Sequence, residues 1–436
     1  MYQRNGIKRA DLISSYSTVS NLRKYSYGGL LFFIIFLLFS SILSAKTFVI
    51  GEKHKIKSIR AALEASSNGD TLIVAGGFYN EGTLLITKSI LLIGMNEPVI
   101  SGNGKHEIVK VKADHVVIRG FIFKDAGINF IYENAAVKLD SVQNCTVEKN
   151  KFINNFFGIY LSKSSSCRIL DNELTAFQKR ETYSGNGIHL WQCREMYIKG
   201  NKINGHRDGI YFEFVKKSRI EENRSRNNIR YGLHFMFSDS CDYSDNYFAG
   251  NGAGVAVMFT KNVRMFNNLF ENNWGGAAYG LLLKDISDSR IFNNRFIKNS
   301  CAVYYEGCSR VLTEKNQFIE NGWGIRLMAN SMDNEFLSNN FIGNTFDVTT
   351  NSTRNYNFFE GNYWSEYKGY DLNKDGIGDI PFRPVKYFSL ISEKVRPSLI
   401  LIRSLFTELI NLAENIFPTL TPAGLTDDKP KMKRIL

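Results

Sequence analysis

Several side chains in the middle of this chain carry donor atoms that suit a copper ion. They are His234, Met236, Met258 and Glu213, together with His189 and Trp191 two repeats before His234 and Met236. Thioether sulfur and imidazole nitrogen suit Cu(I), and a carboxylate suits Cu(II). Exposed methionine in an oxidising compartment is readily oxidised, so an unused pair there is a liability. The alternative is packing, because loops or a partner often cover apolar side chains on such faces.

The elements that position these residues form a repeat. A short phrase, in most copies a glycine followed by alternating apolar residues, begins at positions 158, 187, 209, 232, 254, 280, 302 and 324. A period in this range indicates a solenoid, and alternation by two indicates short strands with one buried face. A coil of ~22 residues is too short for a strand and a crossover helix. We therefore predict an all-β fold, a right-handed parallel β-helix.

A second phrase of the type Asn-x-Phe-x-x-Asn follows each strand. It occupies residues 246–251, 268–273, 294–299, 316–321 and 339–344. Asparagine tolerates left-handed backbone and bonds locally, so these residues are expected at the corners of the coils. Stacking would align their amides and the aromatic residues into ladders, and both ends of the solenoid need caps.

The outward residues of each strand form two columns, both expected to be exposed. The first contains Tyr160, His189, Tyr211, His234, Ala256, Leu282, Tyr304 and Arg326, and the second contains Ser162, Trp191, Glu213, Met236, Met258, Lys284, Glu306 and Met328. Neighbouring rungs lie about 4.8 Å apart. The two methionines are therefore expected side by side, with Glu213 one rung away.

The chain has 436 residues and a net charge of +12. Residues 1–45 contribute five basic side chains and one acidic one, so the remainder carries 12 − 4 = +8. That charge is spread, with no basic run interleaved with aromatics, which argues against nucleic acid as a partner. Composition is sufficient for a large core, with 44% hydrophobic residues.

The first 45 residues predict export. A basic stretch precedes ten apolar residues, 30–39, and Ala45 provides a small residue for cleavage. A retained membrane anchor is the alternative. Either way, the β-helix, assigned to residues 46–390, is expected in the periplasm.

The six cysteines of the chain allow two interpretations. Cys145, Cys167 and Cys193 are expected at one corner of successive coils, with Cys241 and Cys308 recurring there later. Small buried thiols are one interpretation, and a disulfide between rungs is the other. No Cys-x-x-Cys pair indicates a zinc or redox site.

The end of the chain holds two further features. Asp371, Asn373 and Asp375, followed by Gly376, match the start of a calcium loop, although Phe382 stands where such loops need a glutamate. A polar turn that caps the solenoid is the alternative. Residues 391–436 are assigned to a separate carboxy-terminal part.

Within that part, residues 399–417 show helical spacing of apolar residues, which predicts an amphipathic helix. It either packs on the end of the solenoid or docks on a membrane protein or membrane surface. The basic tail, residues 429–434, is expected to be loose.

Several of these phrases resemble NosD-type proteins, the periplasmic β-helix factors that help to mature the copper centres of nitrous oxide reductase. The matching stretches are residues 208–211, 230–238, 254–259, 279–285, 362–379 and the tail from 401 to 427. The resemblance implies partnership with an ABC-type permease and a separate ATPase, and copper or sulfur supply to the reductase, with the reductase or a copper chaperone as a further partner. The chain has no GxxxxGK[ST] loop of its own for ATP.

From the resemblance, His234, Met236 and Met258 are functional candidates because they lie in the matching phrases. His189, Trp191 and Glu213 are candidates only because they lie on the same face. It implies a non-catalytic role with transient copper binding.

Two other functions fit the fold. A polysaccharide lyase or epimerase acting on acidic glycans would need a base and a cation, and His206, Arg207 and Asp208 are the closest local grouping. A surface scaffold or adhesin would need neither.

Overall fold

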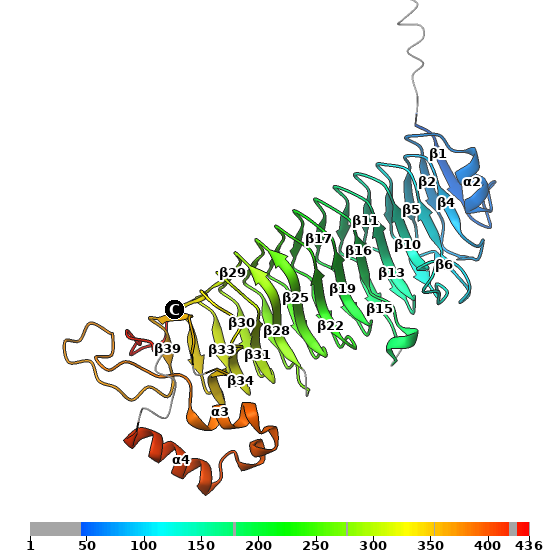
Figure 1. Ribbon diagram of the computed structural model, residues 1–436. Coiled ribbons are helices and arrows are strands. Elements are labelled where there is room, and N and C mark those ends of the chain that lie inside the picture. Colours follow the sequence, from blue (N-terminus) through cyan, green and yellow to red (C-terminus); the bar gives the residue numbers. More distant parts are fainter. Residues whose placement is uncertain (1–44, 178–179, 276–277, 353, 418–424, 436) are drawn as a thin grey trace, which may run out of the picture. The chain divides into compact units, whose positions relative to one another are not determined.

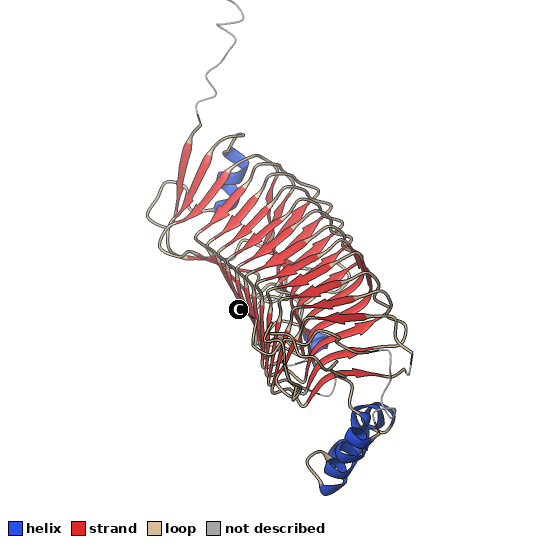
Figure 2. Ribbon diagram, turned by 90° about the vertical axis from the view of Figure 1, so that its left-hand side faces the viewer, coloured by secondary structure: helices blue, strands red, loops and turns tan. Residues whose placement is uncertain are grey.

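The computed structural model describes residues 45–177, 180–275, 278–352, 354–417 and 425–435. Residues 46–436 form one compact unit, whereas the predicted export segment lies, apart from Ala45, outside the described residues. The coils stack into a parallel β-solenoid with three long sheets, as Figures 1 and 2 show. The predicted right-handed β-helix is confirmed.

Each coil contributes about one strand to each of three sheets, which we name A, B and C. Sheet A contains β1 (Thr47–Ile50), β2 (Thr71–Val74), β5 (Leu91–Gly94), β8 (Val117–Arg119), β11 (Thr146–Glu148), β14 (Arg168–Leu170), β17 (Tyr197–Lys199), β20 (Arg219–Glu221), β23 (Asp242–Ser244), β26 (Arg264–Phe266), β29 (Arg290–Phe292), β32 (Leu312–Glu314), β35 (Glu335–Leu337) and β38 (Phe358–Glu360). Sheet B contains β3 (Phe78–Tyr79), β6 (Val99–Ser101), β9 (Ile122–Lys124), β12 (Lys151–Ile153), β15 (Glu173–Thr175), β18 (Lys202–Asn204), β21 (Arg224–Arg226), β24 (Tyr247–Ala249), β27 (Leu269–Glu271), β30 (Arg295–Ile297), β33 (Gln317–Ile319), β36 (Asn340–Ile342) and β39 (Tyr363–Trp364). Sheet C contains β4 (Leu84–Ile86), β7 (Val109–Val111), β10 (Ala135–Asp140), β13 (Phe157–Ser162), β16 (Ile188–Trp191), β19 (Asp208–Glu213), β22 (Tyr231–Met236), β25 (Ala253–Lys261), β28 (Tyr279–Ser287), β31 (Cys301–Glu306), β34 (Trp323–Leu327) and β37 (Phe346–Thr350).

The α-helices lie at the two ends of the solenoid, and a 3₁₀ turn, Glu181–Tyr183, lies between β15 and β16 (Figure 1). At one end is α2 (Ile59–Ala65), where the Ser58 hydroxyl accepts a hydrogen bond from the backbone of Ala61. At the other are α3 (Tyr387–Lys394) and α4 (Leu405–Ile416). The predicted helix over residues 399–417 is thus shorter, because a 3₁₀ turn, Arg396–Leu401, precedes it and Ser404 caps α4. Among the residues described, no helix combines the length and apolar character that crossing a bilayer requires.

The interior is filled by the inward residues of all three sheets, and its aromatic members stack. In sheet B, Phe248, Phe270, Phe296, Phe318 and Phe341 form a continuous column that ends on Trp364, with ring centroids 4.2–5.5 Å apart. Offset stacking of this kind adds to the hydrophobic gain of burying each ring. The column runs parallel to the solenoid axis, so each coil is held to the next by side chains as well as by backbone.

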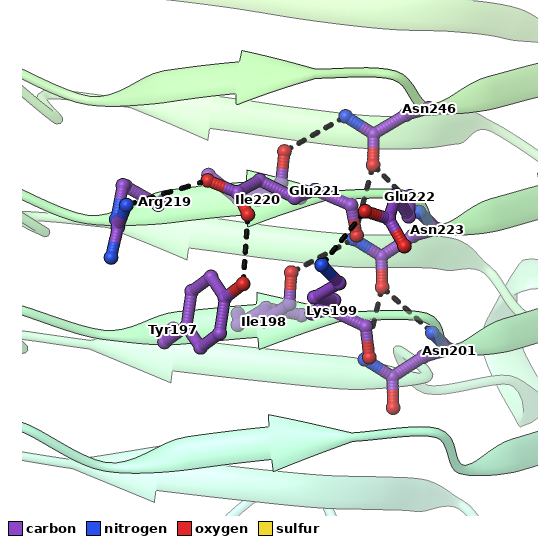
Figure 3. Close-up of polar contacts among 10 residues, drawn as sticks. All are labelled: Tyr197, Ile198, Lys199, Asn201, Arg219, Ile220, Glu221, Glu222, Asn223 and Asn246. Carbon is purple, nitrogen blue, oxygen red and sulfur yellow. Dashed lines mark hydrogen bonds and ion pairs between the residues drawn. The ribbon is translucent and has the colours of Figure 1, made fainter.

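A ladder of buried asparagines runs along the corner between sheets A and B. Asn246 accepts hydrogen bonds from the backbone N (2.9 Å) and the side-chain amide (3.0 Å) of Asn223, and it donates to Asn268 (3.0 Å). Figure 3 shows Asn201, Asn223 and Asn246, and Asn201 donates to Asn223 in the same way. The predicted amide ladder is confirmed. The asparagines lie at the corners, as predicted, but the left-handed backbone there belongs to the residue before each of them, such as Asp245 and Asn267.

The ladder ends on a carboxylate from the tail of the chain. Each asparagine donates in the same direction, so the last one, Asn362, needs an acceptor that no further coil provides. Asp427 supplies it, because one of its oxygens accepts from the backbone N (2.9 Å) and the amide (3.0 Å) of Asn362 and from the indole of Trp364 (3.0 Å). Asp427 is fully buried, and the backbone of Lys431 forms a parallel β-bridge with Tyr363. The prediction of a loose tail is therefore wrong.

The register also corrects the cysteine column. Cys145 lies opposite Cys167, as predicted, but Met196 follows Cys167, because Arg168 pairs with Tyr197. Cys193 and Cys308 belong to a different column, since Cys193 lies opposite Ser164 and Cys308 lies opposite Ile286. Cys241 lies in the predicted column, two rungs beyond Met196. All six cysteines are buried free thiols.

We predict that Asn246→Ala destabilises the solenoid by about 3 kcal/mol, because two buried donors of Asn223 lose their acceptor. Urea denaturation followed by circular dichroism measures the effect. The control is Asn204→Ala, which removes an exposed amide that accepts one hydrogen bond from Asn227 and is expected to change stability by less than about 0.5 kcal/mol. Equal effects of the two substitutions would contradict the importance of the ladder.

Candidate metal-binding face

The outward face of sheet C brings the predicted carboxylate and thioethers together. Glu213 of β19 pairs in register with Met236 of β22, which pairs with Met258 of β25. All three side chains are partly exposed. The adjacency predicted from the sequence is confirmed, and the three residues form one line across three neighbouring strands.

The other outward column is only partly exposed, which corrects the prediction that all of it is exposed: Tyr211, Leu282, Tyr304 and Arg326 are partly exposed, whereas Tyr160, His189, His234 and Ala256 are buried. Tyr160, His189 and His234 are 3%, 7% and 4% exposed. The rings pack on one another: Tyr160 and His189 are stacked with centroids 4.5 Å apart, and Tyr211 lies 4.7 Å from His189 and 5.0 Å from His234. Phe157 covers the end of this column edge-on, 5.3 Å from His189.

The acceptor nitrogen of the His189 ring is already used. The Arg207 guanidinium donates to the Asn186 carbonyl oxygen (3.2 Å), which turns the Asn186 amide nitrogen toward His189 Nδ1 (3.0 Å). An amide nitrogen only donates, so Nδ1 accepts and the proton of the neutral ring is on Nε2. Burial, with a smaller effect of Arg207 and Lys138, lowers the pKa of His189 to about 3. His189 is therefore a neutral structural residue in this arrangement, with no lone pair free for a metal.

His234 is different because one of its nitrogens is unused. Its Nδ1 lies 3.5 Å from a carboxylate oxygen of Asp208 and 3.5 Å from Arg230. Arg230 in turn holds Asp208, which is fully buried, with two hydrogen bonds of 3.1 Å. Nε2 is buried and has no hydrogen-bond partner among the described residues. A buried polar atom without a partner costs about 1–3 kcal/mol, so this nitrogen is the better imidazole candidate for a ligand.

Tyr211 connects His234 to the methionines, and sequence reasoning missed it. Its ring contacts the His234 ring, and its hydroxyl donates to the Met236 sulfur at 3.6 Å. Burial, followed by the charges of Glu213 and Asp208, raises the pKa of Tyr211 to about 12, so it remains a neutral donor. The sequence places Tyr211 between His189 and His234 in the same outward column. Tyrosine is not a usual copper ligand, so the sequence alone does not single it out.

This donor set fits Cu(I) better than a harder ion. Two adjacent thioethers with an unpartnered imidazole nitrogen nearby are soft ligands. Within the described ranges, no three His, Cys, Asp or Glu side chains gather in a way that would hold a metal ion. Of the predicted set, the fold thus assembles the methionine pair with Glu213 beside it.

The predicted calcium loop folds back on itself. Asp371 accepts hydrogen bonds from the backbone of Asp375 (3.2 Å) and Gly376 (2.9 Å), and Asn373 donates to Asp375 (3.0 Å). Asp379, which sequence reasoning did not include, accepts from the backbone of Leu372 (2.7 Å). Calcium binding here stays a prediction.

The grouping expected of a lyase or epimerase does not form. His206 is buried with both ring nitrogens unpartnered among the described residues, and burial lowers its pKa to about 4. Arg207 and Asp208 are occupied by Asn186 and Arg230. The three side chains therefore do not present a base and a cation to one substrate.

Comparison with known proteins adds to this geometry. A family model described as "Periplasmic copper-binding protein (NosD)" matches residues 175–369. The chain is 27% identical over 401 residues to a probable ABC transporter binding protein NosD of Pseudomonas aeruginosa, covering 85% of this chain and 90% of that protein. It is also 27% identical over 358 residues to the protein of the same description from Stutzerimonas stutzeri, covering 77% and 80%.

Among solved structures, a family 28 exopolygalacturonase of Yersinia enterocolitica is similar, with a TM-score of 0.59 and 9% identity over 72% of this chain and 78% of that one. At such low identity this likeness supports the β-helix fold alone.

We predict that His189→Phe, which keeps an aromatic ring between Tyr160 and Tyr211, flattens the acid side of the stability profile. The folded-state pKa of His189 lies below the unfolded value of 6.5, so only the unfolded chain takes up this proton between about pH 6.5 and 3. As the pH falls through this window, the free energy of unfolding of the native protein should therefore decrease by about 1.4 kcal/mol per pH unit because of this histidine. The variant should not show this decrease. Urea denaturation at pH 7 and pH 5 measures the difference. His54→Gln, at an exposed histidine, should leave the native slope unchanged, and a parallel profile for His189→Phe would contradict the assignment.

Proposed function

We propose that this chain, a NosD-type protein, is a periplasmic accessory protein that binds copper transiently while the copper centres of nitrous oxide reductase are assembled. Copper is its cargo, and the chain itself is not a catalyst. The observation that carries the proposal is the register of Met236 and Met258, which sets two partly exposed thioethers side by side on sheet C.

The chemistry of the face supports transient binding. Thioethers bind Cu(I) without carrying charge, so the ion is held by soft ligands and can be passed to a site with more or stronger ones. Glu213 lies one rung from Met236 and offers a carboxylate at the edge of the pair. The unpartnered Nε2 of His234 offers a further ligand if the side chain turns outward from Asp208.

We further propose that α4 docks on an ABC-type membrane complex composed of a permease and a separate ATPase. The relatives from Pseudomonas aeruginosa and Stutzerimonas stutzeri are both named probable ABC transporter binding proteins. On α4, Leu405, Leu409, Leu412 and Ile416 recur at spacings of three and four residues, and each is 56–76% exposed. Such a stripe is the part of a helix that normally packs on a neighbour.

The polar side of α4 faces the rest of the protein instead. The Glu414 carboxylate accepts a hydrogen bond from the backbone of Tyr387 at the start of α3 (3.0 Å). Helix α3 is itself fixed to sheet C, because Glu393 forms two hydrogen bonds with Arg326 (2.8 and 2.7 Å). The solenoid therefore leaves the apolar stripe free for a partner.

We predict that Met236→Leu/Met258→Leu lowers the affinity for Cu(I) by at least about tenfold, the equivalent of 1.4 kcal/mol. Leucine conserves volume, so the packing of the face is retained. An anaerobic competition titration of the exported protein with a chromophoric Cu(I) chelator measures the affinity. Adding His234→Ala tests the imidazole, and a further drop is expected.

The matched control removes two exposed methionines elsewhere, Met95 and Met332, by the same change to leucine. Its affinity should equal that of the native chain. An unchanged affinity in the Met236/Met258 variant would remove this face from the copper-binding role.

We also predict that Leu405→Gln/Leu409→Gln/Leu412→Gln weakens association with the detergent-solubilised permease–ATPase complex by at least about tenfold, because the apolar contact is lost. Surface plasmon resonance with the immobilised complex measures it. As a control, Phe130→Gln/Ile131→Gln/Tyr132→Gln removes three apolar residues that are 53–86% exposed on another part of the chain. Equal binding by the α4 variant and the native chain would refute docking through α4.

A further inference from the structure

Three phenylalanines form an exposed ladder next to the methionine pair. Phe214, Phe237 and Phe259 directly follow Glu213, Met236 and Met258, so the two lines run side by side across three coils. The rings of neighbouring phenylalanines lie 5.2 and 5.1 Å apart and nearly parallel, at 11° and 14°. We call these three residues the Phe ladder.

The fold itself does not require phenylalanine at these positions. All three residues have left-handed backbone, with φ of 56°, 50° and 54°, which costs a non-glycine residue roughly 1–2 kcal/mol. The same corner in other coils is occupied by Lys163, Gln192, Asp285 and Gly307. The corner thus accepts polar residues and glycine.

Nor does the core require the Phe ladder. The three residues are still 44%, 39% and 40% exposed, so more than a third of the hydrophobic gain of burying them is not realised within this chain. An apolar strip kept in a strained, exposed position fits a surface that another molecule covers.

A basic groove opens beside the Phe ladder, and Phe214 of the ladder also lines the groove. Its cations are Lys163, Arg194, Lys216 and Lys217, with Glu195 as its acidic residue, in a hollow of about 670 Å³. Among the described residues, none of these four cations lies within ion-pair distance of a carboxylate. The groove therefore has positive charge to offer to a ligand.

We propose that the Phe ladder and the basic groove together form the docking surface for an acidic protein segment that brings Cu(I) to the methionine pair or takes it away. Apolar side chains of the segment would cover the Phe ladder while its carboxylates enter the groove. This inference rests on the proposed copper role and identifies the partner by its chemistry.

The stacking favours a protein over an acidic glycan as the occupant. Sugars pack their C–H groups against the open face of an aromatic ring. In the Phe ladder the faces of neighbouring rings are turned toward one another, so edges make up most of the accessible surface. Ring edges suit contacts with methionine sulfur and apolar side chains. Opposite charge then sets orientation and raises the rate of encounter.

The test uses labelled synthetic peptides and the exported chain. The first peptide, Asp-Phe-Asp-Met-Gly-Ser-Met-Asp-Phe-Asp, is loaded with Cu(I), and the second replaces each aspartate by lysine. Fluorescence anisotropy should show binding of the acidic peptide only, weakened by 0.5 M salt because the charges are screened. Phe214→Gln/Phe237→Gln/Phe259→Gln should reduce the affinity roughly tenfold or more, and so should Arg194→Gln/Lys216→Gln/Lys217→Gln.

Gln192 occupies the same corner in the native chain, so the glutamine variants are expected to fold, which circular dichroism checks. The affinity of the Phe-ladder variant for Cu(I) alone should be unchanged. Binding of both peptides alike, or of the acidic peptide equally by all variants, would overturn the proposal. So would tight binding of oligogalacturonate that the groove variant loses and the Phe-ladder variant keeps, since that result indicates a glycan site. If the native chain binds the acidic peptide but not Cu(I) alone, the docking surface stands and the copper role fails.

Discussion

The asparagine ladder is the interaction on which the rest of the structure depends. Each coil turns a sharp corner inside the protein, and the backbone N–H there must find an acceptor away from water. Asn223 and Asn246 show the solution, in which one amide oxygen accepts from both the backbone and the side chain of the preceding rung. Because a bond of this kind forms only when the two asparagines are aligned, the ladder also sets the register of the strands.

That register brings residues that are far apart in the sequence into contact on one face. Residues 22 or 23 positions apart become direct neighbours, so Glu213, Met236 and Met258 meet without any of them lying on a loop. The rigid face suits an ion that must be held and released without refolding of the chain. It also places the Phe ladder and the thioethers on one surface, where a single partner can contact both.

The repeat was enough to predict the fold, the strand columns and the neighbours of the methionines, because period and alternation determine them. Burial of the outward histidines was not predicted, since it results from packing among Phe157, His189 and the rings beside it. The cysteine column failed where one coil is longer: 29 residues separate Cys167 from its neighbour Met196, and Cys193 comes too early. A capping residue such as Asp427 has no local signal, since its partner Asn362 lies 65 residues away.

The bond between Asn362 and Asp427 has a mechanical consequence for α3 and α4. The segment between Asn362 and Asp427 is attached to the same coil at both ends. One end continues from Asn362, and the other is held there by the buried carboxylate of Asp427. The helices are thus carried on a closed loop rather than on a free arm. A force on α4 is therefore shared between the two chain segments that join it to the terminal coil, so the proposed docking through α4 would act on that coil at two points.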